Sequence, residues 1–418
     1  TFSDFFGTFG LLLTLDVKNF HYKKLRFKEF TKPWEAQKLG EILTLIQSGL
    51  SRKLSQKDIG VPVLRSNNLI NNELNLDDIS YWYIKDSKGA KIENYFLKEN
   101  DLLINFINSL SQIGKIALFK NELKRNTIFT TNLLRLNFNS KIYIDFMYFY
   151  FQTGKYNNYI QVITKPAVNQ ASFTTVDLKK FNLKVPSLHE QKKIANFLNS
   201  INHKIKLLNK KLGYFKDFKK YCFQNLFSEK LRFKEFIDDW IKIKLGNLVK
   251  IYSGKSPKNL IKDKGKFPYF KVEQLNDCSK FLKITPYLIN DSSLLIKKGS
   301  VIFPKRGMAI MSNKIRILNQ NSFMDTNLMA LTVNEKMMNN EFLFYLLINE
   351  RLSRIADTTS IPQLNNKHIN PYLIYLPSLK EQEKIANFLS SIDKKIDLTQ
   401  NQNFILLLLL LLLLLFMF

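Results

Sequence analysis

One 20-residue stretch occurs twice in this chain of 418 residues, and this repeat constrains the fold more than any other feature. The stretch "PSLHEQKKIANFLNSINHKI" at 186–205 returns as "PSLKEQEKIANFLSSIDKKI" at 377–396, with 15 of 20 positions identical. A second marker, "LRFKEF", occurs at 25–30 and again at 231–236, and each copy is followed by a Trp and by "KLG". Self-similarity on this scale indicates a fold built twice from one unit. The chain therefore reads as two variable halves, each of which ends in the same constant segment.

The constant segment predicts a long helix with a coiled-coil seam. Its apolar residues are spaced alternately by four and three positions, which is the spacing of the a and d positions of a heptad. A Pro that ends the preceding strand, a Ser that can cap and a Glu three residues later fit a capping box at the start of the helix. At about 1.5 Å per residue, the first helix would span roughly 60 Å. The predicted seam consists of Ile194, Leu198, Ile201, Ile205, Leu208 and Leu212 in the first copy, and of Ile385, Leu389, Ile392 and Ile396 in the second.

Two matching seams in one chain favour pairing of the two helices with each other. The alternative is that each helix packs only on its own half. If a two-fold axis relates the halves, the helices run antiparallel and one chain imitates a symmetric dimer. Between the constant segments, short strand-like runs such as "GVPVLRSNNL" and "GSVIFPKRG" precede helical patterns. We therefore expect an α/β (α+β) fold, with two pseudo-two-fold-related domains joined by two long antiparallel coiled-coil helices.

The last residues depart from the repeat. The run "FILLLLLLLLLLFMF" is apolar over 15 residues, whereas a helix that crosses a bilayer needs roughly 18–20. The repeat predicts an amphipathic helix at these positions, and a structural coiled-coil protein tethered to a membrane by this tail is the alternative. The expected ranges are an N-terminal extension at 1–22, a first domain at 23–185, a first helix at 186–229, a second domain at 230–376, and a second helix with the anomalous Leu-rich end at 377–418.

The charge favours a polyanionic partner without identifying it. The chain has 63 Lys and Arg against 35 Asp and Glu, which gives a formal net charge of +28. Most of the basic residues are Lys, as an AT-rich genome would produce whatever the function, so composition alone does not decide. Two cysteines are too few for a disulfide framework or a zinc site, and the cytoplasm is the expected compartment.

Loops at equivalent places in the two halves carry different polar side chains. Residues 65–68, "RSNN", align with 271–274, "KVEQ", and residues 107–115 align with 304–314. Arg can pair with guanine, Asn or Gln with adenine, and Glu with cytosine, while Lys binds phosphate. For each residue the alternative is an ordinary surface polar group. The candidates for DNA contact are Ser48, Gly49, Lys53, Arg65, Asn67, Asn68, Asn108, Gln112, Lys115, Ser253, Lys255, Lys258, Lys271, Glu273, Gln274, Lys305, Arg306, Asn313 and Lys314.

Motifs for catalysis are absent from the sequence. The four histidines show no metal-ligand spacing, and neither a glycine-rich dinucleotide motif nor a P-loop occurs. We expect no catalytic residue and no metal site, and therefore a chain that binds.

The repeated set of "LRFKEF", Trp, "KLG" and "PSLHEQKKIANFL" resembles the specificity (S, HsdS) subunits of Type I restriction-modification systems over about residues 23–400. The resemblance implies two target-recognition domains, each of which reads half of a bipartite asymmetric site in double-stranded DNA, and two helices that fix the spacer. It further implies a non-catalytic subunit that docks two methyltransferase (M) subunits and recruits restriction (R) subunits. S-adenosylmethionine, ATP and Mg would lie on those partners, no cofactor would lie on this chain, and no membrane is expected. The Leu-rich end and the residues before 23 have no counterpart in the family pattern.

Overall fold

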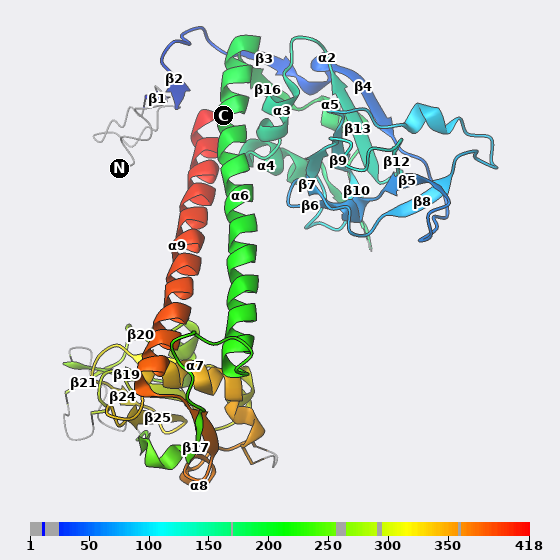
Figure 1. Cartoon of the computed structure of the whole chain (residues 1–418). Coiled ribbons are helices and arrows are strands. Elements are labelled where there is room, and N and C mark those ends of the chain that lie inside the picture. Colours follow the sequence, from blue (N-terminus) through cyan, green and yellow to red (C-terminus); the bar gives the residue numbers. More distant parts are fainter. Residues whose placement is uncertain (1–10, 13–24, 169, 256–264, 291–294, 358–360) are drawn as a thin grey trace. The chain divides into compact units, whose positions relative to one another are not determined.

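The computed structural model describes residues 11–12, 25–168, 170–255, 265–290, 295–357 and 361–418 (Figure 1). Contacts divide the chain into two compact units. Unit 1 comprises Thr1–Asn209 with Gln402–Phe418, and unit 2 comprises Lys210–Asn401. Each unit therefore contains one variable half and part of both long helices. The five ranges drawn along the sequence stay a prediction, and the extension at 1–22 lies outside the described residues except for β1 (Leu11–Leu12), which pairs with β2 (Arg26–Phe27).

The variable half of unit 1 is built on a four-stranded antiparallel sheet. The strands are short and apolar, and β9 is buried along its whole length, so the sheet is covered on both faces. The strand order is β11 (Ile116–Leu118), β9 (Leu102–Asn105), β13 (Leu133–Phe138) and β4 (Leu43–Ser48). A second sheet has the order β12 (Ile128–Phe129), β5 (Gly60–Leu64) and β8 (Ser80–Tyr83), with β12 parallel to β5.

Smaller elements complete unit 1. The aromatic run at 144–150 forms a short helix whose residues Phe146 to Tyr150 are buried, so these rings belong to the core, as expected. The further strands are β3 (Glu35–Lys38), β16 (Asn182–Val185), β6 (Leu69–Ile70), β7 (Glu73–Leu74), β10 (Ile107–Asn108), β14 (Lys165–Pro166) and β15 (Ala171–Ser172). The helices are α2 (Leu39–Ile42), α3 (Ile144–Tyr150), α4 (Gly154–Ile163) and α5 (Thr175–Lys179).

Unit 2 repeats this plan. Its main sheet has the order β18 (Val249–Ser253), β25 (Leu328–Val333), β22 (Val301–Pro304), β23 (Arg316–Leu318) and β20 (Phe281–Leu282). Its second sheet is β21 (Leu288–Ile289), β19 (Phe267–Phe270) and β24 (Phe323–Met324), again with one parallel pair. Strands β17 (Ile241–Lys244) and β26 (Leu373–Leu376) pair as β3 and β16 do, and the helices are α7 (Asn340–Glu350) and α8 (Asn366–Ile369). The structure confirms the two mixed domains expected from the repeat, while a two-fold relation between them stays a prediction.

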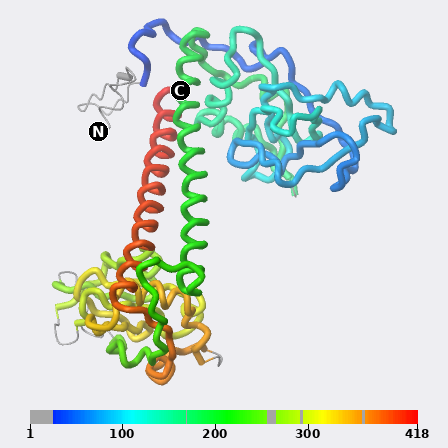
Figure 2. Tube along the Cα trace, viewed as in Figure 1, coloured from blue at the N-terminus to red at the C-terminus, as the bar shows by residue number. Residues whose placement is uncertain are grey.

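The constant segments form α6 (Leu188–Phe227) and α9 (Leu379–Met417), which confirms the two long helices. In each unit their segments run antiparallel, and the C-terminal end of α9 lies beside the start of α6 in unit 1 (Figure 2). The predicted seam residues are buried except for Leu212 and Ile396, which are half-buried. The a and d residues of both helices therefore face the protein interior, as their spacing predicts.

The Leu-rich end continues the seam of α9. Leu409 and Leu413 are 4% and 1% exposed and belong to the core of unit 1, whereas Leu411 and Leu415 are 64% and 66% exposed. As expected for an amphipathic helix, one face of this segment is buried and the other is exposed. Since the residues are all leucine, only their position on the helix distinguishes the two faces. By length and composition α9 could cross a membrane, but between Leu406 and Met417 its inner face packs against the core of unit 1.

The start of each long helix is held by a buried ion pair. The Glu190 carboxylate accepts two hydrogen bonds from the Arg26 guanidinium, at 2.7 Å and 2.8 Å, and Glu381 does the same with Arg232 at 2.8 Å and 2.9 Å. Both Glu side chains are only 2% exposed. The expected Ser cap is present at both helices, since the Glu190 and Glu381 amides donate to the Ser187 and Ser378 hydroxyls at 3.4 Å. The Glu half of the expected capping box differs, because each Glu side chain bonds to the Arg of the repeated "LRFKEF" segment.

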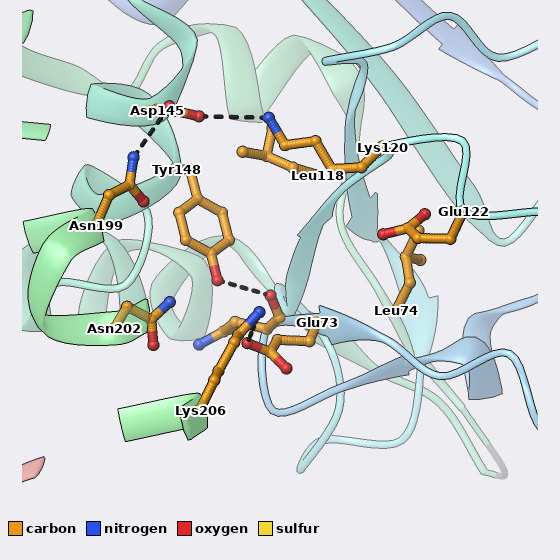
Figure 3. Close-up of a pocket in the computed structure, with 11 residues that line it drawn as sticks. Glu73, Leu74, Leu118, Lys120, Glu122, Asp145, Tyr148, Asn199, Asn202 and Lys206 are labelled. Carbon is orange, nitrogen blue, oxygen red and sulfur yellow. Dashed lines mark hydrogen bonds and ion pairs between the residues drawn. The ribbon is translucent and has the colours of Figure 1, made fainter. Parts of the chain in front are cut away.

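A polar cavity of about 240 Å³ marks the place where the variable half of unit 1 meets α6 (Figure 3). There Asp145 of α3 accepts a hydrogen bond from Asn199 of α6 at 3.0 Å and lies 3.7 Å from the Lys120 ammonium. Unit 2 has a related arrangement, in which the Lys280 ammonium contacts Glu341 at 2.6 Å and Ser390 of α9 at 3.0 Å. In each unit, polar bonds thus attach the sheets to a long helix.

Candidate nucleic-acid interface

The loops that follow β4 and β5 enclose a polar groove of about 360 Å³ on unit 1. Strand β12 lies beside β5, so the turn after β12 forms the third wall. Neutral hydroxyl and amide groups from that turn face two arginines from the other loops. The groove is lined by Leu50, Ser51, Arg52, Arg65, Ser66, Asn67, Thr130, Thr131 and Asn132. A groove that combines guanidinium, hydroxyl and amide groups has the donors and acceptors that base edges require.

Arg52 is held rigidly at one side of this groove. Its Nε and Nη2 donate to Asp86 at 2.8 Å and 2.7 Å, and its Nη1 donates to the Ser51 carbonyl at 2.7 Å. The Asp86 side chain is fully buried and also accepts hydrogen bonds from the Trp82 indole and the Ala90 amide. These bonds, led by the one from Arg52, hold the pKa of Asp86 well below its usual range. The Arg52 side chain therefore lines one side of the groove in a fixed position.

Arg65 is held more loosely. Its Nη2 donates to the Asp78 carboxylate at 2.6 Å and to the Asp78 carbonyl at 3.1 Å. Its Nε is buried and has no hydrogen-bond partner among the described residues. Asn67, also in the groove, donates to the same Asp78 oxygen at 3.2 Å. The structure thus brings two predicted reading residues together around one carboxylate.

The equivalent loop of unit 2 keeps the backbone and changes the side chains. In both loops a side-chain oxygen accepts a hydrogen bond from the backbone three residues earlier: Asn68 from Arg65 at 2.8 Å, and Gln274 from Lys271 at 2.9 Å. In unit 2 the Lys271 ammonium lies 3.6 Å from the centre of the Tyr287 ring. This is the shared frame with different side chains that the alignment of the halves predicts.

Glu273 is the exposed acceptor of that second loop. It accepts hydrogen bonds from Gln274 at 3.0 Å and from the Tyr287 hydroxyl at 3.1 Å. These bonds, the one from Gln274 first, hold the pKa of Glu273 below its ordinary value. The side chain is therefore an ionised acceptor at neutral pH.

Three of the predicted contact residues are buried, which disfavours contact with DNA. Asn68 and Gln274 are 1% and 5% exposed, and their amides are occupied by the loop bonds described above. Gly49 is buried, and a Cβ there would lie 2.0 Å from the Phe129 carbonyl oxygen, so glycine allows a close backbone approach. These residues shape the loops.

Two further candidates bond to the backbone. The Ser48 hydroxyl donates to the Thr131 carbonyl at 3.0 Å, and the Asn313 amide donates to the Ile348 carbonyl at 2.9 Å. Lys258 lies outside the described residues. The candidates that remain exposed are Lys53, Asn67, Gln112, Ser253, Lys255, Glu273 and Arg306, and those that are half-buried are Arg65, Asn108, Lys115, Lys271, Lys305 and Lys314. Their contact with DNA stays a prediction.

Lys305 and Arg306 place two cations side by side on unit 2. Burial, and then the charge of Arg306, hold the pKa of Lys305 below its ordinary value. An adjacent anion would relieve this repulsion, as expected where phosphate binds.

Sequence reasoning missed several groove residues of unit 1. Thr130, Thr131 and Asn132 lie outside the loops that were compared between the halves, and so does Asp78, which lies in the turn before β8 and bonds to the lining residues Arg65 and Asn67. Arg52 offered one usable signal, since Arg is scarce in this chain and this one precedes the candidate Lys53. The others become visible only when β5, β8 and β12 are paired.

Comparison with known proteins identifies the family. The model of the Type I restriction modification DNA specificity domain matches residues 31–213 and 237–406, that is, both halves of the chain. The chain belongs to this family. A Methanocaldococcus jannaschii protein named as the specificity subunit of the MjaX type I restriction enzyme is 28% identical, over 94% of each chain. The MjaVIII specificity subunit of the same organism is 26% identical, over 91% of this chain and 92% of its own length.

Solved structures support the same fold. The crystal structure of the S subunit of a Type-I restriction-modification system from M. genitalium has a TM-score of 0.63 at 17% identity, and covers 94% of this chain and 98% of that one. A chain from a structure of an assembled type I R-M system has a TM-score of 0.52 at 14% identity. The family match and the named relatives show that the chain functions in DNA recognition, and the alternative of a membrane-tethered structural protein gains no comparable support.

Proposed function

We propose that this specificity subunit reads a bipartite asymmetric DNA site, one half with unit 1 and the other half with unit 2. In unit 1 the reading residues are Arg65 and Asn67, and in unit 2 they are Lys271, Glu273 and Arg306. The lysines of the adjoining loops bind phosphates and supply affinity that depends on salt.

One observation carries this proposal. In the loops that begin at Arg65 and Lys271, the backbone amide of the first residue donates to a side-chain oxygen three residues later. The loops nevertheless present an Arg and an Asn in unit 1, and a Lys and a Glu in unit 2. A guanidinium and an amide are complementary to guanine and adenine, whereas a carboxylate accepts from cytosine. Two loops with the same frame and different chemistry suit two different half-sites.

The long helices fix the distance between the half-sites and dock the partner subunits. In this proposal α6 and α9 each bind a methyltransferase subunit, and restriction subunits join that assembly. The chain contributes recognition and no catalytic group, while S-adenosylmethionine, ATP and Mg act on the partners, and the assembly works in the cytoplasm. The relatives named as type I specificity subunits support this assignment.

The proposal is tested by mapping methylated adenines across the genome of a host that expresses the chain with its neighbouring methyltransferase gene. We expect a split asymmetric motif that disappears when this chain is deleted. Arg65→Ala should change base preference in one half-site, and Arg306→Ala should change only the other. A uniform loss of methylation at all sequences, with both half-sites kept, would make each Arg a phosphate contact and contradict the assignment.

A further inference from the structure

An acidic residue is bonded to two lining residues of the groove of unit 1, and this is unexpected in a chain of net charge +28. Asp78 lies in the turn before β8, and its side chain is 61% exposed beside the groove. An exposed carboxylate at a DNA-binding surface repels phosphates, so its presence there requires an explanation.

The contacts of Asp78 connect it to both reading residues. One carboxylate oxygen accepts from Arg65 and from Asn67, and the backbone carbonyl accepts from Arg65 and, at 3.0 Å, from Asn68. Asp78 is therefore bonded to three of the four residues in the reading loop. It gathers side chains that would otherwise be free to turn toward solvent or toward the DNA backbone.

The guanidinium of Arg65 remains incompletely bonded in this arrangement. Only Nη2 is bonded to Asp78, Nη1 donates no hydrogen bond within the described part of the chain, and Nε is buried without a partner. The side chain is 25% exposed, so water reaches little of it. Nη1 is therefore available to donate to a ligand in the groove, and the acceptors of a guanine edge fit such a donor.

We propose that Asp78 is a positioning residue that determines specificity in the first half-site. Its carboxylate holds Arg65 and Asn67 toward the groove, and its charge penalises a phosphate that approaches the same guanidinium. Arg65 then bonds only where a base edge presents acceptors inside the groove. This inference rests on the proposed function of Arg65 and adds to it the residue that orients the Arg.

The second loop supports the idea that each reader has a dedicated support. In unit 2 the turn before β21 supplies Tyr287, whose ring lies against the Lys271 ammonium and whose hydroxyl donates to Glu273. A side chain from the corresponding turn thus contacts the reading residues in both units. In unit 1 the support is an anion that holds a cation and an amide, and in unit 2 it is an aromatic ring that holds a cation and an anion.

Asp78→Asn is the informative variant, because Asn keeps an oxygen for Arg65 and removes the charge. The matched control is Asp58→Asn, since Asp58 forms an ion pair with Arg125 at 2.6 Å and is 48% exposed, and its bonds go to Gly60 and Arg125, which do not line the groove. Both variants change the net charge equally. Asp78→Glu tests rescue by the same charge on a longer side chain.

The assay uses the subunit assembled with its methyltransferase partner. Methylation is measured on duplexes that differ by single base pairs in the first half-site, and binding to an unrelated duplex is measured at several salt concentrations. We expect Asp78→Asn to weaken discrimination at the Arg65-dependent position by about 5- to 150-fold, the range of one bidentate base contact. Binding to unrelated DNA should tighten, and its dependence on salt should steepen by about one unit, because the released Arg reaches a phosphate.

At the Arg65-dependent position, the double variant Arg65→Ala with Asp78→Asn should match Arg65→Ala alone, since Asp78 acts on that position through Arg65. If Arg65→Ala alters base preference while Asp78→Asn leaves it unchanged, the role of Asp78 is overturned and the proposed function stands. If neither variant alters the first half-site, the assignment of Arg65 itself fails. Equal effects of Asp58→Asn and Asp78→Asn would reduce the effect to overall charge and also overturn the inference.

Discussion

Replacing Leu413 with Ala tests whether the Leu-rich end of the chain is a packed part of unit 1. Leu413 is 1% exposed and belongs to the same core as Ile194 and Leu198 of α6. Removing such a buried side chain costs about 2–5 kcal/mol, the transfer term together with the cavity that remains. Ala is at least as good a helix former as Leu, so the loss would come from packing and not from the helix itself.

The matched control is two residues away in the same run. Leu411 is 64% exposed, so Leu411→Ala should change the stability by no more than about 0.5 kcal/mol. Both variants remove the same atoms from the same homopolymer and lower its hydropathy equally. Any difference between them therefore reports on which face of α9 is buried.

Hydrogen exchange measured by mass spectrometry gives the free energy of opening locally. Peptides that cover 188–209 and 402–418 should exchange roughly 30-fold to a few thousand-fold faster in Leu413→Ala, since each 1.4 kcal/mol is a factor of ten. In Leu411→Ala their exchange should stay within about two- to three-fold of the parent. Equal responses of the two variants would refute the packing of α9 in unit 1, and they would favour a tail that is held by a membrane or left in solvent.

Three further predictions follow from the ion pairs and the helices. Glu190→Gln leaves the Arg26 guanidinium without its carboxylate and should lower the free energy of unfolding of unit 1, as measured in urea. Breaking a buried ion pair costs about 3–5 kcal/mol, and we expect the lower end of this range because Arg26 is partly exposed. Glu381→Gln should have the same effect on unit 2. Because the pKa of Asp86 is depressed in the folded state, its ion pair stabilises the fold above the unfolded-state pKa of about 3.9, and this stability is lost as the pH falls through the folded-state pKa. Unfolding followed by Trp82 fluorescence should show this acid dependence. An Asp86→Asn variant with the same acid dependence would contradict the reasoning. Deleting Leu207–Gly213 together with Leu398–Phe404 removes one heptad from each helix and keeps both seams in phase. Since a heptad spans roughly 10 Å, the spacer of the methylated motif should shorten by about three base pairs while both half-sites are retained. An unchanged spacer would show that the helices do not set the distance between the half-sites.

The sequence by itself determined the plan of this protein. The repeated segments predict two similar mixed domains and two long helices, because heptad spacing leaves a helix only one apolar stripe to bury. The same spacing identifies the buried seam correctly from Ile194 to Leu208 and from Ile385 to Ile392. Periodic local patterns of this kind survive any tertiary arrangement that buries them.

Only the tertiary structure decided which polar and which Leu residues are available at the surface. Asn67 and Asn68 are adjacent and chemically identical, yet Asn67 is exposed in the groove and Asn68 is buried as the cap of its own loop. Leu411 and Leu413 differ in the same way within one homopolymer. Asp78 reaches Arg65 because β8 pairs with β5, a contact between residues separated in sequence. Local sequence cannot specify such differences, since burial depends on which distant segments pack against a residue.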